Sequence, residues 1–483
     1  MPRRLTLVVL SAVLYILSFP KFNQAWVAWI SLVPLSILAR RCTTRQAFLW
    51  GWLSGILAYS GILYWIIVTF QAAHLSISLA GLCLLLLAGY LGLYWGAWAW
   101  FIQKVDPPLA GTAAWVVLEY VRTYLLSGFP WTLLADSQVK ILPLIQIASI
   151  TGVYGVSFLI VWFNLVVAQW RLKPLALSMM AVVLTCLFGY SRLKSYAGEP
   201  AGPKIRVALV QGSIDQYKKW DKSYVEDIEK TYEHLVSQAA GSRPAMIIWP
   251  ETSVPGYLLQ EPSLRSWLTG VVRNSHTSHL VGAPVIHNGM AYNSAFSFNP
   301  EGILVGEYAK QHLVPFGEVV PWSGFLGHFI RVLNDLGGFA AGTQPSVLDV
   351  GGGYPVGVNI CYEAIFPDLV RRSVRQGARI IANLTNDGWY MQTAAPYQHW
   401  APNIFRAVEN NRWLVRADNT GISGIIEPTG RVQAASAIFH PAVIEGTVQA
   451  HNGLTFYTRY GDLFAWICVM FCTLICLRDI LRQ

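Results

Sequence analysis

The sequence predicts a membrane α-helical bundle of about eight spans, joined to an exported α/β domain. Three observations support this division. The chain of 483 residues is 54% hydrophobic and only 13% charged, whereas a soluble protein carries about 25% charged residues. Long apolar runs are confined to residues 1–190 and 463–478, and residues 191–462 alternate short β-type and helical segments.

The membrane part is predicted from apolar segments close to the roughly 20 residues that a spanning helix needs. The first follows Arg3 and Arg4, as in a signal peptide, but it ends in "SFPKF" without a small-residue cleavage site. We therefore expect seven spans in 1–190, the outer domain in 191–462, and an eighth span with a short tail in 463–483. The candidate spans lie near 5–20, 25–40, 47–70, 75–102, 108–126, 153–171, 174–190 and 463–478.

The distribution of charge predicts the orientation. Residues 191–462 hold 22 basic and 22 acidic side chains, so the net charge of +9 comes from the segments that flank the apolar runs. The basic residues gather in alternate loops, and such loops stay in the cytoplasm. Both termini are therefore expected in the cytoplasm, with residues 191–462 on the outer side. Because topology explains the basic balance, it does not indicate a nucleic-acid partner.

Two charged residues are predicted inside the bundle. Glu119 and Arg122 are spaced i, i+3 in "LEYVRTYLL", and side chains at this spacing are neighbours on a helix. They could pair with each other, or they could line a headgroup or substrate cavity. The sequence does not separate these alternatives.

The outer domain is predicted to alternate strands and helices. Helical periodicity appears at 224–239 and 400–411. "PDLVRRSVRQG" predicts a further helix, with Pro367 just inside its start and Gly377 just past its end. The expected strands are 205–211, 245–250, 279–286, 292–299, 355–360, 379–385 and 412–418.

Cys361 alone among the seven cysteines belongs to the outer domain. An oxidising compartment would usually pair thiols, and the domain contains no second cysteine, CxxC motif or zinc-type Cys/His cluster. A small buried hydrophobe is the alternative reading of such a residue. However, Cys361 lies where a strand turns towards a helix, which is where α/β folds place reactive side chains.

Glu251 and Lys310 occupy similar positions at strand ends. Glu251 follows "AMIIWP", and Lys310 follows the β-like "ILVGEY". A thiol needs a base before it can attack, and the oxyanion formed by the attack needs a positive charge or N–H donors. The three residues would supply nucleophile, base and cation, although each of the two charges, taken singly, is more often solvated.

These segments resemble the Glu–Lys–Cys pattern of the nitrilase superfamily. "WPET" contains Glu251, "AKQHLVPFGE" contains Lys310 and Glu318, and "NICYE" contains Cys361. With the predicted spans, the whole chain resembles the bacterial apolipoprotein N-acyltransferase family, and "GFPW", "NLTNDGWY" and "FRAVENNRWLVRADNTGIS" extend the similarity. The resemblance implies a nitrilase-like α-β-β-α sandwich for the outer domain.

The resemblance also implies a reaction. Members of this family move an acyl chain from the sn-1 position of a phospholipid to the α-amino group of a lipoprotein's N-terminal diacylglyceryl-cysteine. In the implied ping-pong mechanism Glu251 is the base, Cys361 carries the acyl group as a thioester, and Lys310 stabilises the oxyanion. The implied partners are the phospholipid donor, the diacylglyceryl-apolipoprotein acceptor and the lipid bilayer. We expect a monomer in the bacterial inner membrane, with a periplasmic catalytic domain and neither cofactor nor metal.

Further residues are implied by the same resemblance. Glu318 and Glu363 are expected to be supporting carboxylates, and Tyr362 lies beside the nucleophile. Trp220, in "QYKKWD", matches a family tryptophan near the substrate. For Tyr362 and Trp220, packing in the core is the alternative.

Two apolar loops are expected to cover the site. Residues 252–259 and 319–330 are apolar where a soluble enzyme would have polar loops. We expect both to dip into the membrane interface and admit the acyl chain, with Trp322 and Phe325 as contacts. Packing of these loops against the membrane helices is the alternative.

Three other functions remain open. A membrane-tethered nitrilase or amidase acting on small nitriles or amides would use the same three residues. A transporter with an accessory domain would leave the three residues unexplained, and the spans show no obvious inverted repeat. A Cys–His protease could use His312 or His399, but it would leave Glu251 and Lys310 idle.

Overall fold

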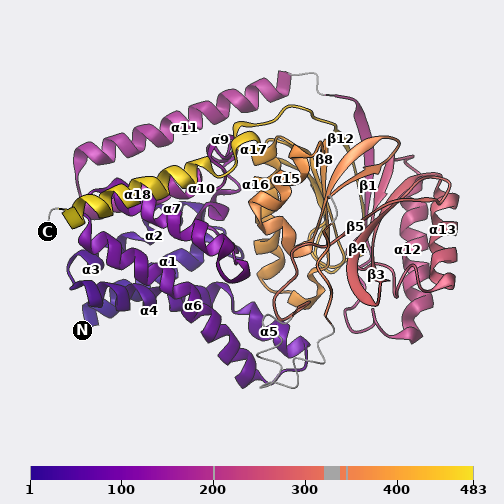
Figure 1. The fold of residues 1–483 in the computed structure, drawn as a ribbon, viewed down its shortest axis with the longest axis horizontal. Helices are drawn as coiled ribbons and strands as arrows, with labels where there is room; N and C mark the ends of the chain where they lie inside the picture. The colour runs from indigo at the N-terminus through magenta and orange to yellow at the C-terminus, as the bar shows by residue number, and fades with distance from the viewer. Residues whose placement is uncertain (1, 199–201, 320–337, 344–345, 482–483) are drawn as a thin grey trace. The chain divides into compact units, whose positions relative to one another are not determined.

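Contacts within the chain divide it into two units, both drawn in Figure 1. We call the first the helical unit; it comprises Met1–Glu199, Thr393–Glu409 and Thr455–Gln483. We call the second the sandwich unit; it comprises Pro200–Gln392 and Asn410–Leu454. The computed structural model of the protein describes residues 2–198, 202–319, 338–343 and 346–481.

The division by contacts differs from the ranges expected from the sequence. Helix α11 (Leu172–Gly198) continues beyond residue 190, and most of α16 (Ala395–Asn410) groups with the helical unit, as does α17 (Phe456–Tyr460). The buried amide of Gln398 explains the placement of α16. It accepts hydrogen bonds from two indoles and donates two to backbone oxygens of the helical unit, with Trp65, Trp131, Pro20 and Ile62 as partners.

Helices occupy each of the eight ranges predicted to span the membrane. Within the helical unit, the α-helices up to residue 169 are α1 (Pro2–Ser18), α2 (Ala28–Ser31), α3 (Val33–Arg40), α4 (Thr44–Ile62), α5 (Trp65–Ala72), α6 (Ile77–Lys104), α7 (Pro108–Tyr124), α8 (Leu142–Ile145), α9 (Ala148–Thr151) and α10 (Tyr154–Gln169). The chain ends with α18 (Leu463–Leu481).

Fewer helices than the eight predicted have the length and the apolar composition of a membrane span. Among the described residues, two helices are long and apolar enough, namely α6 and α11 over Leu172–Tyr196. Two bent pairs raise the number to four: α4 with α5, bent by 53°, and Leu142–Thr151 with α10, bent by 117°. Helices α1 and α7 have 17 residues each, which at 1.5 Å per residue is shorter than a hydrocarbon core of about 30 Å.

Small residues bring α4 and α6 into close contact. A Cβ atom at Gly55 would lie 2.7 Å from the Cα of Gly92, and one at Gly92 would lie 2.9 Å from a backbone oxygen of α4. Contacts this short exclude any side chain, so the two backbones pack directly. Such small-residue seams are typical of helix pairs in membranes, where van der Waals packing drives association.

Glu119 and Arg122 do not pair with each other in the helical unit. Glu119 Oε1 accepts a hydrogen bond from the Leu134 N–H at 2.8 Å. Arg122 donates to the Tyr59 hydroxyl and to the Thr132 carbonyl. Of the two readings that the sequence left open, the ion pair is therefore wrong. Both side chains line a small pocket within the unit.

The sandwich unit contains two six-stranded sheets. The first has the order β12-β1-β2-β3-β4-β5 and the second has the order β11-β10-β9-β8-β7-β6. The first sheet comprises β1 (Lys204–Gln211), β2 (Met246–Ile248), β3 (Ser278–His287), β4 (Met290–Phe298), β5 (Leu304–Ala309) and β12 (Ala442–Gln449). The second comprises β6 (Val347–Val350), β7 (Tyr354–Ile360), β8 (Ile380–Thr385), β9 (Leu414–Asp418), β10 (Gly424–Ile426) and β11 (Val432–Ala435).

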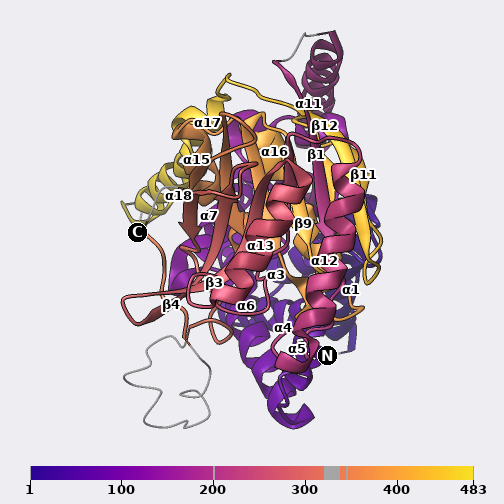
Figure 2. The same ribbon diagram turned by 90° about the vertical axis from the view of Figure 1, so that its right-hand side faces the viewer.

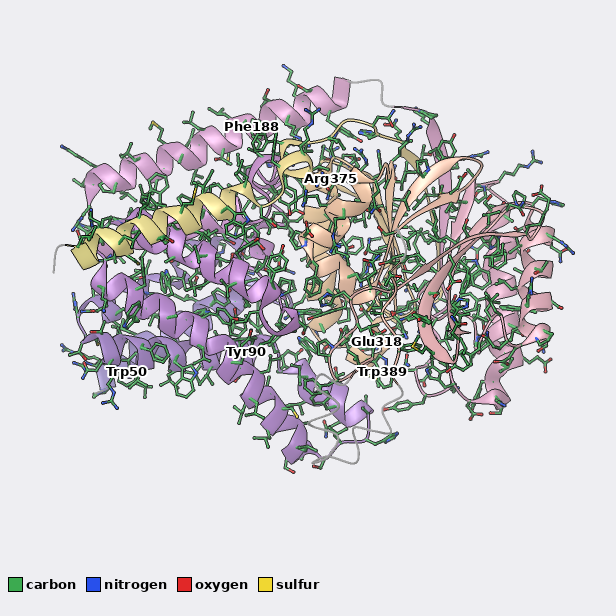
Figure 3. All side chains as sticks on the ribbon, in the orientation of Figure 1. Trp50, Tyr90, Phe188, Glu318, Arg375 and Trp389 are labelled. Atoms are coloured by element: carbon green, nitrogen blue, oxygen red, sulfur yellow. The ribbon has the colours of Figure 1, made fainter. Side chains whose placement is uncertain are left out.

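Helices cover the outer faces of the two sheets. Helices α12 (Val225–Ala240) and α13 (Pro262–Ser275) lie side by side over the first sheet (Figure 2), and a fully buried cluster with Ile247 and Val281 joins them to it. A second cluster, with Leu209 and Val358, fills the space between the sheets. Helix α15 (Pro367–Arg375) packs on β7 on the opposite side. The layers follow the order helix, sheet, sheet, helix, as the resemblance implied.

The core between the sheets predicts a specific loss of stability. Ile380→Ala removes a fully buried side chain, and should lower the free energy of unfolding by about 2–5 kcal/mol, because a cavity remains. Ile303→Ala is the matched control, since Ile303 is 57% exposed, and should change it by less than about 0.5 kcal/mol. Thermal unfolding of the full chain in detergent measures both. Equal effects of the two substitutions would contradict this assignment of the core.

Candidate active site

Three strand ends carry the predicted reactive residues. Glu251 lies three residues beyond β2, Lys310 directly follows β5, and Cys361 directly follows β7. Strands β2 and β5 belong to the first sheet and β7 to the second, so the site is assembled from both sheets of the sandwich unit.

Cys361 lies at a sharp turn of the backbone. It is the first residue of a 3₁₀-helix, Cys361–Ile365, that leads from β7 into α15, and its φ angle is 52°. Positive φ is uncommon for residues other than glycine, and strained positions of this kind cluster at functional sites. Asn383 Nδ2 lies 3.4 Å from the Cys361 carbonyl oxygen, to which it donates. The predicted strand-to-helix location of this thiol is confirmed.

The Lys310 ammonium lies between two carboxylates. Its Nζ is 3.2 Å from Glu251 Oε1 and 2.9 Å from Glu318 Oε1, and the lysine side chain is only 1% exposed. Asn293 Nδ2, on β4, donates to the same two oxygens at 2.7 and 2.9 Å. The position between the carboxylates is therefore taken by an ammonium, so this pair of oxygens is not free to coordinate a metal ion.

A glycine on the neighbouring strand lets the Glu251 segment approach. A Cβ atom at Gly282 would lie 2.3 Å from the Pro250 oxygen and 2.7 Å from Glu251 Cα. Backbone atoms cannot move aside as a flexible side chain could. Only glycine fits at this point of β3, which lets the backbone of Glu251 pass close to the strand.

Burial and charge keep the two key groups protonated. Burial by itself would lower the pKa of Lys310, but Glu251 and Glu318 outweigh this effect and raise its pKa well above the usual value. Burial raises the pKa of the Cys361 thiol, Glu251 raises it further, and Lys310 only partly opposes them. Cys361 is therefore a neutral thiol at rest. It needs a base to take its proton, and Glu251 is the nearby carboxylate that can do so.

Glu363 joins the Lys310 segment to the Cys361 segment. Its Oε1 accepts hydrogen bonds from the N–H groups of Gln311 and His312 at 2.7 and 3.0 Å, and Oε2 accepts one from Ile360 at 2.6 Å. The hydroxyl of Tyr308, on β5, also donates to this carboxylate. Glu363 is fully buried. It holds the ends of β5 and β7 together, a positioning role.

Tyr362 packs among aromatic rings. Its ring centroid lies 5.2 Å from that of Phe366 and 5.8 Å from that of His312. The His312 ring in turn packs on Phe366, with centroids 3.9 Å apart. Tyr362 is buried, so its side chain packs in the core, as in the alternative that the sequence left open.

The structure tests some of the residues predicted to contact the substrate or the membrane. Trp220, in the loop between β1 and α12, is 51% exposed, which excludes the core-packing reading. In the 252–259 loop, Val254 and Leu258 are fully buried in the core under α12 and α13, so the expectation that these side chains enter a membrane interface is wrong. Trp322 and Phe325 lie outside the described residues.

A buried polar network escaped the sequence analysis. Arg416, inside β9, donates to Asp387 at 2.8 Å, to Asp418 at 2.9 Å and to Asn383 at 3.0 Å, and all four side chains are fully buried. Asn383 also donates to the Cys361 carbonyl, so the network reaches the nucleophile. Two residues in the sequence could have indicated this network: Arg416 within the apolar run "RWLVRAD" and Asn383 within "RIIANLT". Charged and amide side chains are rarely buried without partners, so their positions in apolar strands predict hydrogen-bonded neighbours.

Comparisons with known proteins agree with this geometry. Residues 206–452 match the carbon-nitrogen hydrolase family model, so the sandwich unit with its buried thiol is of that class. Residues 11–166 match the family model of the apolipoprotein N-acyltransferase N-terminal domain. The chain belongs to the apolipoprotein N-acyltransferase family, which is an acyltransferase branch of the nitrilase superfamily.

Relatives match over nearly the whole chain. The apolipoprotein N-acyltransferase of Geobacter metallireducens is 40% identical, over 97% of this chain and 94% of its own length. That of Methylococcus capsulatus is 33% identical, over 95% of this chain and 93% of its own length. Among solved structures, the Nesterenkonia AN1 amidase from the nitrilase superfamily has a TM-score of 0.41 and 20% identity, covering 54% of this chain and 95% of its own. The family assignment rests on the two family models and on the sequence relatives, not on this structural similarity.

The charges around Cys361 predict how its reactivity depends on pH. Alkylation by iodoacetamide, followed by mass spectrometry of the peptide containing Cys361, should give an apparent pKa above the ordinary thiol value of about 8.5. Glu251→Gln should lower this pKa, because an anion near the thiolate is lost. Lys310→Met should raise it, because a cation is lost. Glu226→Gln, on the exposed surface of α12, is the control and should leave it unchanged. Shifts of the opposite sign would contradict the assigned charges.

Proposed function

We propose that this protein transfers an acyl chain from the sn-1 position of a membrane phospholipid to the α-amino group of the N-terminal diacylglyceryl-cysteine of apolipoproteins. Membership of the apolipoprotein N-acyltransferase family supports the substrates. The observation that carries the chemistry is the buried arrangement in which Lys310 lies between Glu251 and Glu318. The charges of these three side chains act on the pKa of the Cys361 thiol.

The first half-reaction would form a thioester. Glu251 takes the proton from Cys361 Sγ, and the sulfur attacks the carbonyl carbon of the phospholipid ester. The Lys310 ammonium stabilises the negative oxygen that develops. The carbon–oxygen bond then breaks, Glu251 returns the proton to the leaving alcohol oxygen, and a lysophospholipid departs. The acyl group remains on Cys361 as a thioester.

The second half-reaction would form an amide. The lipoprotein amine attacks the thioester carbon while Glu251 takes a proton from the nitrogen. The carbon–sulfur bond breaks, and the proton passes to the departing sulfur, which restores the neutral thiol. The burial of Cys361, Lys310 and Glu251 supports a thioester intermediate, because water must be kept away from the thioester until the amine attacks.

The proposed substrates place the reaction at a membrane. We propose the eight-span arrangement with both termini in the cytoplasm and the sandwich unit in the periplasm of a bacterium with an inner membrane. The apolar helices α6 and α11 and the two bent helix pairs support membrane insertion, and the basic loops support the orientation. Within this proposal the exposed Trp220 contacts lipid, and the enzyme acts as a monomer.

An acyl-enzyme assay tests the proposal. The full chain in detergent is incubated with a phospholipid of defined acyl chains and then weighed intact by mass spectrometry. We expect one added acyl mass, removed by neutral hydroxylamine, on the wild type and none on Cys361→Ala. Cys468→Ala is the matched control, since Cys468 is also buried but lies in α18, and should still form the adduct.

The same assay can contradict the proposal. A folded wild type that forms no adduct with phospholipid, and that instead releases ammonia from small amides, would identify an amidase. An adduct that persists in Cys361→Ala would place the acyl group on another residue.

A further inference from the structure

A second buried ammonium lies beside Glu251. Lys219, in the loop between β1 and α12, is only 3% exposed, although lysine is rarely buried without a charged partner. Its Nζ donates a hydrogen bond to the backbone oxygen of Glu251 at 3.1 Å. Lys219 therefore contacts the main chain of the proposed base and leaves the carboxylate of Glu251 to Lys310.

Lys219 differs from Lys310 in how its charge is compensated. Lys310 has carboxylate oxygens at 3.2 and 2.9 Å, whereas within the described residues no carboxylate oxygen lies within 4.0 Å of the Lys219 ammonium. The titratable groups that face Lys219 from the elements around it are Glu251 beyond β2, Asp418 at the end of β9 and Cys361 beyond β7. All three favour the charged ammonium, and burial opposes it.

Hydrogen bonds fix the loop that carries Lys219. The Lys219 N–H donates to the Asp215 carbonyl at 3.1 Å. Gln216 accepts a hydrogen bond from Asn386 Nδ2 at 2.8 Å, and the Ser213 N–H donates to the Asn419 carbonyl at 2.8 Å. Asn386 follows β8 and Asn419 follows β9. The loop is thus attached to the strand ends around the site, and Lys219 is held in place.

Lys219 adds a second cation to the charged groups around Glu251. Glu251 and Glu318 are two anions, while Lys310 is one cation, and Cys361 is neutral at rest. Without a further cation, transfer of the thiol proton to Glu251 would occur in a buried site with excess negative charge. A fixed positive charge within such a site stabilises charge that develops there, because the surroundings screen it poorly.

We propose that Lys219 is a positioning residue of the acyl-transfer reaction, which fixes Glu251 through its backbone carbonyl and balances the negative charge when the thiolate forms. This inference rests on the proposed function and adds a residue that acts through Glu251. The alternative is a lysine that only fills space under the loop.

The two roles differ in their pH dependence. Burial lowers the pKa of Lys219 to about 8, so the ammonium loses its charge as the pH rises through that value. If the charge assists thiolate formation, acylation of the wild type should decline above about pH 8, although higher pH by itself favours a thiolate. A lysine that only fills space would produce no such decline.

The experiment measures the rate of acyl-enzyme formation in a single turnover against pH, with Lys219→Met, Lys219→Arg and the wild type. We expect Lys219→Met to be slower by about 10- to 100-fold at neutral pH and to lack the decline near pH 8. Lys219→Arg should retain most of the rate and also lack the decline, because a guanidinium stays charged. Lys218→Met is the matched control, since Lys218 is exposed and lies over Tyr224, and should behave as the wild type.

Alkylation of Cys361 by iodoacetamide is the second readout, and it needs no lipid. Lys219→Met should raise the apparent pKa of Cys361, while Lys219→Arg and Lys218→Met should not. A wild type that forms no adduct would refute the proposed function, and alkylation would then still test the electrostatic role of Lys219. A wild-type pKa in Lys219→Met, or a decline near pH 8 that survives in Lys219→Arg, would overturn the inference.

Discussion

The Lys310 ammonium, buried between the carboxylates of Glu251 and Glu318, is the interaction on which the site depends. Three charges are withdrawn from water here, and the loss of one partner from such a group costs about 3–5 kcal/mol. The surrounding structure must therefore hold all three side chains at hydrogen-bonding distance. Asn293 donates hydrogen bonds to both carboxylates, and Gly282 leaves room for the Glu251 backbone. Burial, together with two anions around one paired cation, also explains why Cys361 rests as a thiol.

The two sheets must keep their strand ends aligned for this group to face Cys361. The Glu363 carboxylate provides the link, because it accepts hydrogen bonds from the segments after β5 and before Cys361. On the far side of the nucleophile, Asn383 connects the Cys361 carbonyl to the buried Arg416 network. The nucleophile is thus fixed from both sides by buried polar groups, which are rigid only when every member is satisfied.

The reactive residues could be predicted from the sequence because each lies within three residues of the end of an apolar strand, and the ends of strands are local features of the pattern. Lys219 and Asn293 could not, because their roles arise from pairing between distant segments. The expectation that Val254 and Leu258 reach a membrane interface is wrong, since an apolar segment suits a core as well as an interface, and these two side chains are buried. Strand β11 was missed because it is largely exposed and lacks the apolar pattern of a core strand. The number of spans stays a prediction, because apolar composition does not reveal where a helix bends or ends, and among the described residues two helices, or four with the bent pairs, have the length and hydropathy of a span.

The most direct test of this account is the protonation state of Cys361 at neutral pH. Infrared spectroscopy of the full chain, with Cys361→Ser as the reference, isolates the S–H stretching band of this thiol. The buried Glu251–Lys310–Glu318 arrangement predicts that the band is present in the wild type, is absent from the reference, and persists to a higher pH than for an ordinary cysteine. Absence of the band, together with the ultraviolet absorbance of a thiolate, would show a preformed ion pair and contradict the role of Glu251 as the base.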